Sequence, residues 1–324
     1  MKKKVLVISL LVTVLVLMTA CGGSGDKGSS KKDPAFRPDG EWIVYWDAGS
    51  PEDYTDLTEE VILFSCFYKE DGSLFVPDAL DGLVREIPMD RTVYLSFTND
   101  VKKAGGETVQ KSPKLLRQLL AGDPSARSAA SDMIKIAKAQ EADGVELDFE
   151  NLGSDDTLWG NWLTLVRQLN RRASRAGLRV RVVIPAVFPK DPGNLPDGPE
   201  YTVMCYNLHG IGTEPGPKAD SEFLRKTAKR YRGLSDVRFA LAGGGFDWRK
   251  SGRAVSVTTK EAVRLVGGNA RRDKESRAMH GTYTKNKVRH TVWYADDTTL
   301  KAWKKELQSA SGRQVKIDLW RREP

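Results

Sequence analysis

The chain has 324 residues, of which 40% are hydrophobic and 29% charged, and this composition excludes a disordered or collagen-like protein. The formal net charge is +8, but without Lys2, Lys3 and Lys4 the chain keeps 48 of its 51 Lys and Arg against 43 Asp and Glu, an excess too small to indicate nucleic-acid binding. Three cysteines without CxxC spacing exclude a disulfide scaffold and the usual zinc motif.

Residues 1–20 have the pattern of an export signal. Three lysines precede the apolar run 5–18, which is too short to span a bilayer. A small residue stands directly before Cys21, as in a bacterial lipobox, where the cysteine is lipidated and becomes the new N-terminus. We therefore predict a lipoprotein signal peptide, lipid attachment at Cys21 and a flexible tether over 21–38. This implies an extracytoplasmic protein anchored to the bacterial cell membrane; an ordinary signal peptide with an incidental cysteine is the alternative.

Short runs rich in Val, Ile, Tyr and Phe alternate with helical periodicity, the pattern of a parallel β/α fold. We expect eight strands, near residues 42–47, 61–66, 92–97, 144–150, 179–186, 201–207, 237–243 and 315–320. Helical periodicity is clearest at 125–141, 157–175, 221–232 and 298–307. Eight strands in this length predict an α/β fold, a closed (β/α)8 TIM barrel over residues 39–324, rather than an open sheet.

Two segments depart from a plain barrel. Residues 247–294 are expected to form a small α+β insertion before the last helix, with a helix at 259–266 and strands near 280–284 and 289–294. Between residues 249 and 290 there are 12 Lys and Arg against three Asp and Glu, so this segment either meets an anionic polymer or is a solvated insertion. The sequence ends four residues after Trp320, and we expect the barrel to close there without an eighth helix or to stay partly open.

The most informative segment is 143–150, in which acidic and apolar residues alternate in the order DGVELDFE. Side chains two apart on a strand share a face, so Glu146, Asp148 and Glu150 project together, with successive Cα atoms about 6–7 Å apart. Such crowding raises at least one carboxyl pKa. Barrel enzymes carry catalytic residues at the C-terminal ends of strands, which favours an active site here over an edge strand with a solvated acidic face.

These residues closely resemble the DGxDxDxE signature of glycoside hydrolase family 18, the chitinases and their relatives. Asn151 and Leu152 match the branch that acts in spore germination and on peptidoglycan. Weaker matches follow in order: 203–209 (VMCYNLH) with MxYDxH, 244–248 (GGFDW) with YGYDW, 292–297 (VWYADD) with VWFED, and a final Leu319-Trp320. The likeness covers nearly the whole domain, from Trp42 to Trp320.

The resemblance implies a retaining glycosidase in which the substrate supplies its own nucleophile. Glu150 would protonate the glycosidic oxygen and later activate water. Asp148 would orient the substrate's N-acetyl group, which attacks the anomeric carbon, an exception to the scheme with two catalytic carboxylates. Tyr206 would hydrogen-bond the acetamido group. The expected substrate-binding residues are Glu146, Asn207, Trp320, Tyr45 and Met204, with Trp320 as the floor under the sugar.

Two positions depart from the family pattern. Glu146 stands where Asp or Asn is usual, and we expect it to support Asp148 by a shared proton or a hydrogen bond. Asn207 stands where Asp is commoner, and because an amide cannot ionise it would lower the rate or move the pH optimum. Tyr45 and Trp46 both close the first strand, and alternation does not tell which of them faces the site.

Other chemistry-bearing residues are assigned no catalytic role. Trp159 and Trp162, three apart on a helix, fit a core-facing stripe better than a sugar-stacking platform. Cys66 and Cys205 lie in apolar runs as small buried hydrophobes. We expect no metal and no cofactor, because the three histidines are too scattered to form a ligand cluster; they are His209, His280 and His290.

The predicted function is cleavage of β-1,4 linkages at N-acetylglucosamine in peptidoglycan or spore cortex. The expected partners are a polysaccharide that contains N-acetylglucosamine and, through the lipid, a membrane, with no nucleic acid, and we expect a monomer. Chitin and N-glycan cores are the alternative substrates. A non-catalytic glycan-binding barrel and a scaffold lipoprotein whose basic segment binds anionic wall polymers are the competing functions.

Overall fold

A computed structural model describes residues 34–47, 56–187, 190–249 and 254–323. The predicted signal peptide, Cys21 and the tether up to residue 33 lie outside these ranges. One compact unit begins at Ala35 and contains the whole predicted barrel. At its start the backbone N–H of Phe36 donates to Oδ2 of Asp297 at 3.1 Å.

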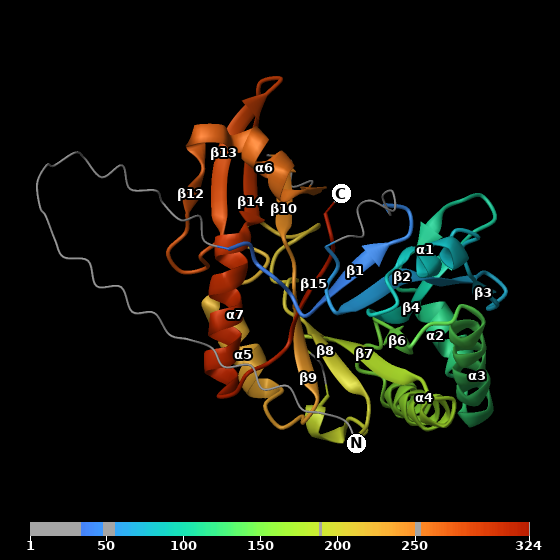
Figure 1. Ribbon diagram of the computed structural model, residues 1–324. Coiled ribbons are helices and arrows are strands. Elements are labelled where there is room, and N and C mark those ends of the chain that lie inside the picture. The colour runs from blue at the N-terminus through green and yellow to red at the C-terminus, as the bar shows by residue number, and fades with distance from the viewer. Residues whose placement is uncertain (1–33, 48–55, 188–189, 250–253, 324) are drawn as a thin grey trace, which may run out of the picture. The chain divides into compact units, whose positions relative to one another are not determined.

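Eight parallel strands close into a barrel (Figure 1). They are β1 (Gly40–Val44), β2 (Glu60–Lys69), β4 (Thr92–Lys102), β6 (Gly144–Asp148), β7 (Arg179–Pro185), β8 (Glu200–Met204), β9 (Val237–Leu241) and β15 (Ile317–Leu319). Strand β15 pairs with both β9 and β1, and β2 pairs with both β1 and β4. The (β/α)8 prediction is confirmed, and the ring is complete at the point where the sequence left an opening possible.

Helices cover the outside of the barrel. They are α1 (Leu80–Glu86), α2 (Pro113–Leu119), α3 (Asp123–Ala139), α4 (Asp156–Arg175), α5 (Ser221–Arg230) and α7 (Asp297–Ser311). Helix α4 shows the local cause: Asp155 caps it by accepting a hydrogen bond from the Leu158 N–H at 3.0 Å, and an apolar stripe faces the sheet. Trp159 and Trp162 stack 5.0 Å apart in that buried stripe, so the core assignment is confirmed. Between β7 and β8, the described residues contain only the short 3-10 helix η2 (Pro192–Asn194).

The chain leaves the barrel after β9 to form the insertion, which Figure 1 shows in orange beyond the end of α7. It contains β10 (Gly244–Arg249), β11 (Ala254–Val257), α6 (Thr259–Val266), η3 (Gly267–Asn269), β12 (Arg271–Arg272), β13 (Met279–Lys285) and β14 (Val288–Ala295). The strands form one antiparallel sheet in the order β11-β10-β14-β13-β12. The pairing of β10 with β14 begins at Gly244, three residues before the expected start of the insertion at residue 247. Gly244 lies opposite Ala295, so the two ends of the insertion meet there.

Two short hairpins that the sequence did not reveal lengthen one side of the barrel. Strand β3 (Leu74–Phe75) folds back on β2, and β5 (Thr108–Val109) folds back on β4. As a result β2 and β4 have 10 and 11 residues, whereas β6, β8 and β9 have five each. Their outer ends therefore rise past the C-terminal rim of the barrel, where barrel enzymes place their active sites.

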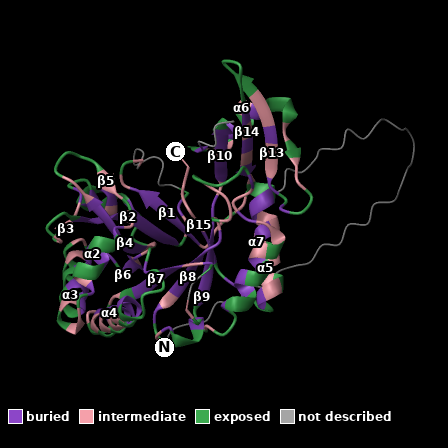
Figure 2. Cartoon of the chain, turned by 180° about the vertical axis from the view of Figure 1, so that it is seen from behind, coloured by how far each residue is buried: buried purple, intermediate pink, exposed green. Residues whose placement is uncertain are grey.

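The barrel strands are largely buried (Figure 2), and strand alternation divides their apolar side chains between two clusters. One face of each strand packs outward against helices, as Val145 and Leu147 of β6 do. The other face fills the barrel, where a second apolar cluster contains Trp42, Ile62, Tyr94, Val183, Met204 and Ala240. Cys66 and Cys205 are buried as predicted, and burial raises the pKa of the Cys66 thiol to about 12.

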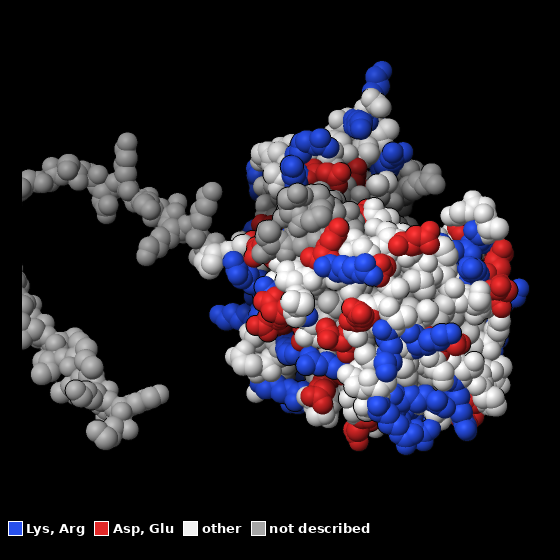
Figure 3. Space-filling view, turned by 45° about the vertical axis from the view of Figure 1, so that its right-hand side comes forward, with Lys and Arg blue, Asp and Glu red and all other residues white. Residues whose placement is uncertain are grey.

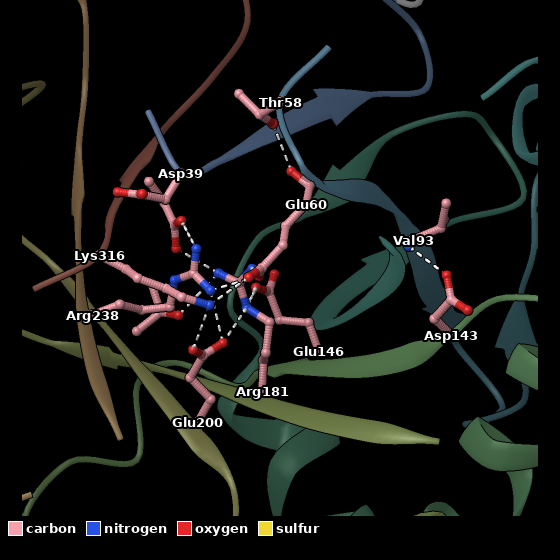
Figure 4. Close-up of polar contacts among 12 residues, drawn as sticks. Asp39, Thr58, Glu60, Val93, Asp143, Glu146, Arg181, Glu200, Arg238 and Lys316 are labelled. Carbon is pink, nitrogen blue, oxygen red and sulfur yellow. Dashed lines mark hydrogen bonds and ion pairs between the residues drawn. The ribbon is translucent and has the colours of Figure 1, made fainter. Parts of the chain in front are cut away.

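Below that cluster, toward the N-terminal ends of the strands, the barrel interior is charged (Figure 4). Arg181 of β7 donates to Oδ2 of Asp318 at 2.6 Å and to Oε2 of Glu60 at 3.3 Å. Arg238 of β9 donates to the same Glu60 oxygen at 2.5 Å, to Oε2 of Glu200 at 2.8 Å, and to Asp318. Both guanidinium groups are fully buried, so their charges are stable there only because carboxylates surround them.

The ion network also sets the protonation of its carboxylates. Burial alone would raise the pKa of Glu60, but Arg238, Lys316 and Arg181 more than offset it, and the net pKa lies below the usual 4.5. Lys316 donates to Oε1 of Glu60 at 2.7 Å. A carboxyl with a lowered folded-state pKa stabilises the fold above its unfolded pKa, and this stability is lost as the pH falls through the lowered value.

We expect Arg238→Met to lower the free energy of unfolding by about 3–5 kcal/mol, because it leaves buried carboxylates without their cation. Arg225→Met is the matched control, since Arg225 pairs with Glu306 on the surface at 3.1 Å and such pairs contribute about 0–1 kcal/mol. Urea denaturation at pH 7 measures both variants. Equal losses for the two arginines would contradict the structural role of the buried network.

Candidate active site

A cleft of about 510 Å³ opens at the C-terminal end of the barrel. Its lining includes Trp46, Phe64, Phe67, Thr98, Asp148, Glu150, Met204, Tyr206, Asn207 and Trp320. These residues come from the ends of β1, β2, β4, β6, β8 and β15. The closed ring therefore brings together six of the eight residues that the sequence predicted for catalysis or substrate binding; Glu146 lies deeper in the barrel and Tyr45 outside the cleft.

Asp148 and Glu150 stand at the centre of the cleft. Strand β6 ends at Asp148, two residues earlier than expected, and pairs with both β4 and β7, which excludes the edge-strand alternative. Asn99 holds the backbone beyond the strand: its Oδ1 accepts from the Glu150 N–H at 2.8 Å, and its Nδ2 donates to the Glu150 carbonyl at 3.0 Å. These two bonds aim the Glu150 side chain into the cleft.

A lysine that the sequence did not suggest contacts the Glu150 carboxyl group. Nζ of Lys111 lies 2.7 Å from both carboxylate oxygens. The Lys111 backbone is held on both sides, because its N–H donates to Oδ1 of Asp100 at 2.7 Å and its carbonyl accepts from Nδ2 of Asn151 at 3.1 Å. Lys111 lies in a loop, 39 residues before Glu150 in the chain. No spacing pattern in the sequence indicates that the two side chains meet.

Asp148 lacks the partners that its neighbours have. Its Oδ1 is buried without a hydrogen bond. Burial first, and then the nearby Glu150 and Glu146 carboxylates, raise the pKa of Asp148 well above the usual 3.8. This is the direction expected for crowded carboxyl groups. Asp148 can therefore hold a proton at a pH where an exposed aspartate is ionised.

Glu146 lies deeper and is tied to other elements. The indole Nε1 of Trp42 donates to its Oε1 at 2.7 Å, and Nε of Arg181 lies 3.4 Å from its Oε2. Burial raises the pKa of Glu146, while Arg181 and Trp42 oppose that rise. The expected hydrogen bond to Asp148 is not found among the described contacts, because the longer side chain reaches across the barrel to Trp42. Glu146 acts on Asp148 through charge instead.

Aromatic rings form the floor and one wall of the cleft. Tyr206 and Trp320 stack with centroids 6.3 Å apart and planes 9° apart, and Trp320 packs edge-on against Trp42 at 5.7 Å and Phe64 at 5.0 Å. Burial, followed by the Asp148 and Glu150 carboxylates, raises the pKa of the Tyr206 hydroxyl. The hydroxyl therefore stays a hydrogen-bond donor facing the carboxyl groups.

The remaining predicted residues take different places. Nδ2 of Asn207 points to Sδ of Met204 at 3.7 Å, and both line the cleft. Of the two aromatic residues after β1, Trp46 is 52% exposed and lines the cleft. Tyr45 packs on the hydrophobic core and lies 6.0 Å from the Phe67 ring. A substrate contact by Tyr45 remains a prediction, and Trp46 is the residue that the structure adds.

Within the described ranges, no three His, Cys, Asp or Glu side chains gather in a way that could hold a metal ion. The buried His290 instead pairs with Asp247 at 2.9 Å and stacks on Tyr283. In the same part of the chain, no helix has the length and apolar character needed to cross a membrane.

Known proteins resemble this chain in sequence and in fold. No family model matches it. The uncharacterized glycosylase YvbX of Bacillus subtilis is 23% identical over 226 residues, which make up 63% of this chain and 63% of YvbX, so the match spans less than two thirds of that relative. The spore cortex-lytic enzyme SleL of Bacillus cereus has a TM-score of 0.71 at 16% identity, over 90% of this chain and 72% of SleL. A chitinase of Chromobacterium violaceum has a TM-score of 0.70 at 19% identity, over 88% and 94%.

The structural likenesses show a fold shared with chitinases and SleL, and the glycosylase relative agrees with it. The cleft and its two carboxyl groups lie at the C-terminal end of that shared barrel.

The Lys111 contact can be tested without substrate. Because the Lys111 cation lowers the pKa of Asp148 against burial and its acidic neighbours, Lys111→Met is expected to move that pKa further up. The carboxyl ¹³C shift of Asp148 in an NMR titration measures it. Lys114→Met, on the exposed side of α2, is the control and should leave the titration in place; an unchanged curve in Lys111→Met would contradict the contact.

Proposed function

We propose that the protein is a retaining glycosidase that cleaves the β-1,4 linkage next to N-acetylglucosamine with the help of the substrate's own acetamido group. The observation that carries this proposal is that two carboxyl groups line the same cleft. One belongs to Asp148, whose Oδ1 is buried without a hydrogen bond, and the other to Glu150. Asp148, whose pKa is raised by burial and by its acidic neighbours, can hold a proton beside a second carboxyl group on the cleft wall. Acid–base chemistry on a glycosidic bond needs carboxyl groups that can hold and release a proton.

Glu150 is the proposed proton donor. Its side chain is 18% exposed and lines the cleft, so it can reach the glycosidic oxygen of a bound glycan. It protonates the leaving oxygen as the bond breaks, and afterwards removes a proton from the water that opens the intermediate. The backbone bonds from Asn99 keep its position constant through both steps.

Asp148 and Tyr206 are the proposed partners of the acetamido group. When the acetamido oxygen attacks the anomeric carbon, the ring that forms carries a positive charge. That charge favours the ionised form of Asp148, whose pKa is raised in the free protein by burial and by Glu150 and Glu146. Tyr206 can donate a hydrogen bond to the same group, while Trp320 supports the sugar face from below.

Peptidoglycan or its spore-cortex form is the proposed substrate. The support is the likeness in fold to SleL, named as a spore cortex-lytic enzyme, and the Asn151-Leu152 resemblance. Chitin or N-glycan cores are the alternative, because the chitinase of Chromobacterium violaceum has an equally similar fold. A non-catalytic glycan-binding barrel is a second candidate, favoured by Asn207 in place of an ionisable side chain.

Hydrolysis tests the catalytic proposal. We expect the full chain to release fragments with N-acetylglucosamine at the new reducing end from peptidoglycan, detected by mass spectrometry. Glu150→Gln and Asp148→Asn should each lower turnover by about 10²–10⁴-fold, the usual contribution of a positioned acid or base.

Thermal melting controls for folding in both variants. Turnover that is unchanged in Asp148→Asn would overturn the assigned mechanism. A lack of products from peptidoglycan and from chitin oligosaccharides, with glycan binding kept by the native and variant proteins, would establish the glycan-binding candidate instead.

We further propose that lipid on Cys21 holds the protein at the extracytoplasmic face of the bacterial membrane. Cys21→Ala is expected to abolish fatty-acid labelling and to move the protein from the detergent phase to the aqueous phase in a phase-partition experiment. Ser24→Ala is the matched control and should partition like the native chain. Labelling that survives in Cys21→Ala would contradict the anchor.

The basic insertion is the feature that favours the competing function, a scaffold lipoprotein that binds anionic wall polymers. Figure 3 shows Lys and Arg side chains over the insertion at the top of the view, with an acidic patch among them. The exposed basic residues described there are Arg249, Lys260, Arg264, Arg271, Lys274, Arg277, Lys285, Lys287 and Arg289. A basic surface of this kind is suited to binding an anionic polymer.

A further inference from the structure

The outer end of the cleft is built by the β4–β5 hairpin. Thr98, Asp100 and Lys102 all line the cleft, and they share one face of β4 because they lie two residues apart. Thr98 pairs with Asp148 in the sheet. Lys102 lies four residues beyond Thr98 on β4, past an irregularity in the pairing of β4 with β2, and so stands further toward the outer end of the strand than the catalytic carboxyl groups.

The Lys102 ammonium is held over aromatic rings. Its Nζ lies 4.9 Å from the centroid of Phe67, 5.7 Å from that of Trp46 and 5.9 Å from that of Tyr45. The ring faces attract the cation and keep it beside the cleft. In contrast to a carboxylate, a ring face does not neutralise the charge.

Neighbouring lysines have acidic partners that Lys102 lacks. Lys103 pairs with Glu107 at 2.9 Å, and Lys111 pairs with Glu150 at 2.7 Å. Among the described residues, the ion pairs within 4.0 Å include none of Lys102. The nearest acidic residue on its strand face, Asp100, accepts a hydrogen bond from the Lys111 backbone. Burial raises the pKa of Asp100, and the Lys102 charge lowers that pKa without an ion pair, and by less than Lys111 does.

The groups around Lys102 suit a sugar that carries an anion. Thr108 lies directly opposite Lys102 in the hairpin and, with Gln110, offers uncharged hydrogen-bonding groups to the cleft. The half-exposed Trp46 ring provides an apolar face for a sugar. A lysine ammonium is a point charge on a flexible stem, suited to a single carboxylate.

We propose that Lys102, with Trp46 and Thr108, forms a subsite for a carboxylate carried by the glycan. In a peptidoglycan strand that carboxylate belongs to the 3-O-lactyl group of a sugar or to its stem peptide, whereas a chitin strand has none. The subsite would therefore select peptidoglycan over neutral glycans. This inference rests on the proposed glycosidase function and names the substrate class of the same site.

The experiment compares glycan strands of equal length that carry different substituents on the lactyl group. One set has free lactyl carboxylates after removal of the stem peptides, a second has the same carboxylates converted to neutral methyl amides, and a third keeps the stem peptides. The measured quantity is the ratio of kcat/KM on a charged set to that on the neutral set. Native protein, Lys102→Gln, Lys102→Arg and the exposed-helix control Lys114→Gln are compared.

We expect the native protein to have a kcat/KM ratio of about ten, the effect of one partly exposed charge-assisted contact. The ratio should fall as salt is added. Lys102→Gln should bring the ratio close to one, while Lys102→Arg and Lys114→Gln keep it. Preference for the first set assigns the lactyl carboxylate, and preference for the third alone assigns the stem peptide. A native ratio of one, or one unchanged in Lys102→Gln, overturns the proposal.

Binding separates this inference from the glycosidase proposal. In the Glu150→Gln background, calorimetric titration gives the affinity for each set of strands without turnover. If the native protein cleaves no set, the glycosidase proposal fails, and the titration still decides on the subsite. Selective loss of affinity for charged strands in Lys102→Gln supports it, and equal affinities for charged and neutral strands overturn it.

Discussion

The buried guanidinium of Arg181 is the group on which the rest of the barrel interior depends. It contacts Asp318 and Glu60 below and Glu146 above, and so joins β2, β6, β7 and β15 inside the ring. A charge buried this deeply costs several kcal/mol unless it is surrounded by partners. The strands are therefore held in a register that brings those carboxylates to it, and the same register sets the height of the acidic residues at the cleft.

From this layer upward, each level of the barrel determines the next. Glu146 receives the Trp42 indole hydrogen bond, Trp42 packs against Trp320, and Trp320 stacks with Tyr206 at the cleft floor. The three alternating acids of β6 and the residues just after it therefore lie in different surroundings, although their residue types are nearly the same. Glu146 is paired, Oδ1 of Asp148 is buried without a hydrogen bond, and Glu150 faces the cleft, where Lys111 contacts it. The three side chains differ in burial and in contacts because of their surroundings and not because of their residue type.

The proposed substrate selection belongs to a different part of the fold. The long strands β2 and β4, extended by β3 and β5, form the wall that carries Phe67, Lys102 and Lys111. Leu74 of β3 and Val109 of β5 are partly buried and pack against the hydrophobic core, so the hairpins are anchored on the ring that they extend. In this chain, the catalytic centre is set by the ring and the proposed choice of glycan by the hairpins.

The sequence by itself determined the eight-strand barrel, the shared face of Glu146 and Asp148 on β6, and helix α6 at 259–266, where Thr258 and Glu261 form a capping box. These features follow from periods of two and 3.6 residues and from local caps, which need no distant partner. Only the tertiary structure decided that Lys111 meets Glu150, that Trp46 and not Tyr45 lines the cleft, and that Glu146 bonds Trp42. The physical reason is that these contacts join residues far apart in the chain, through loop conformations and ring closure that no local pattern encodes.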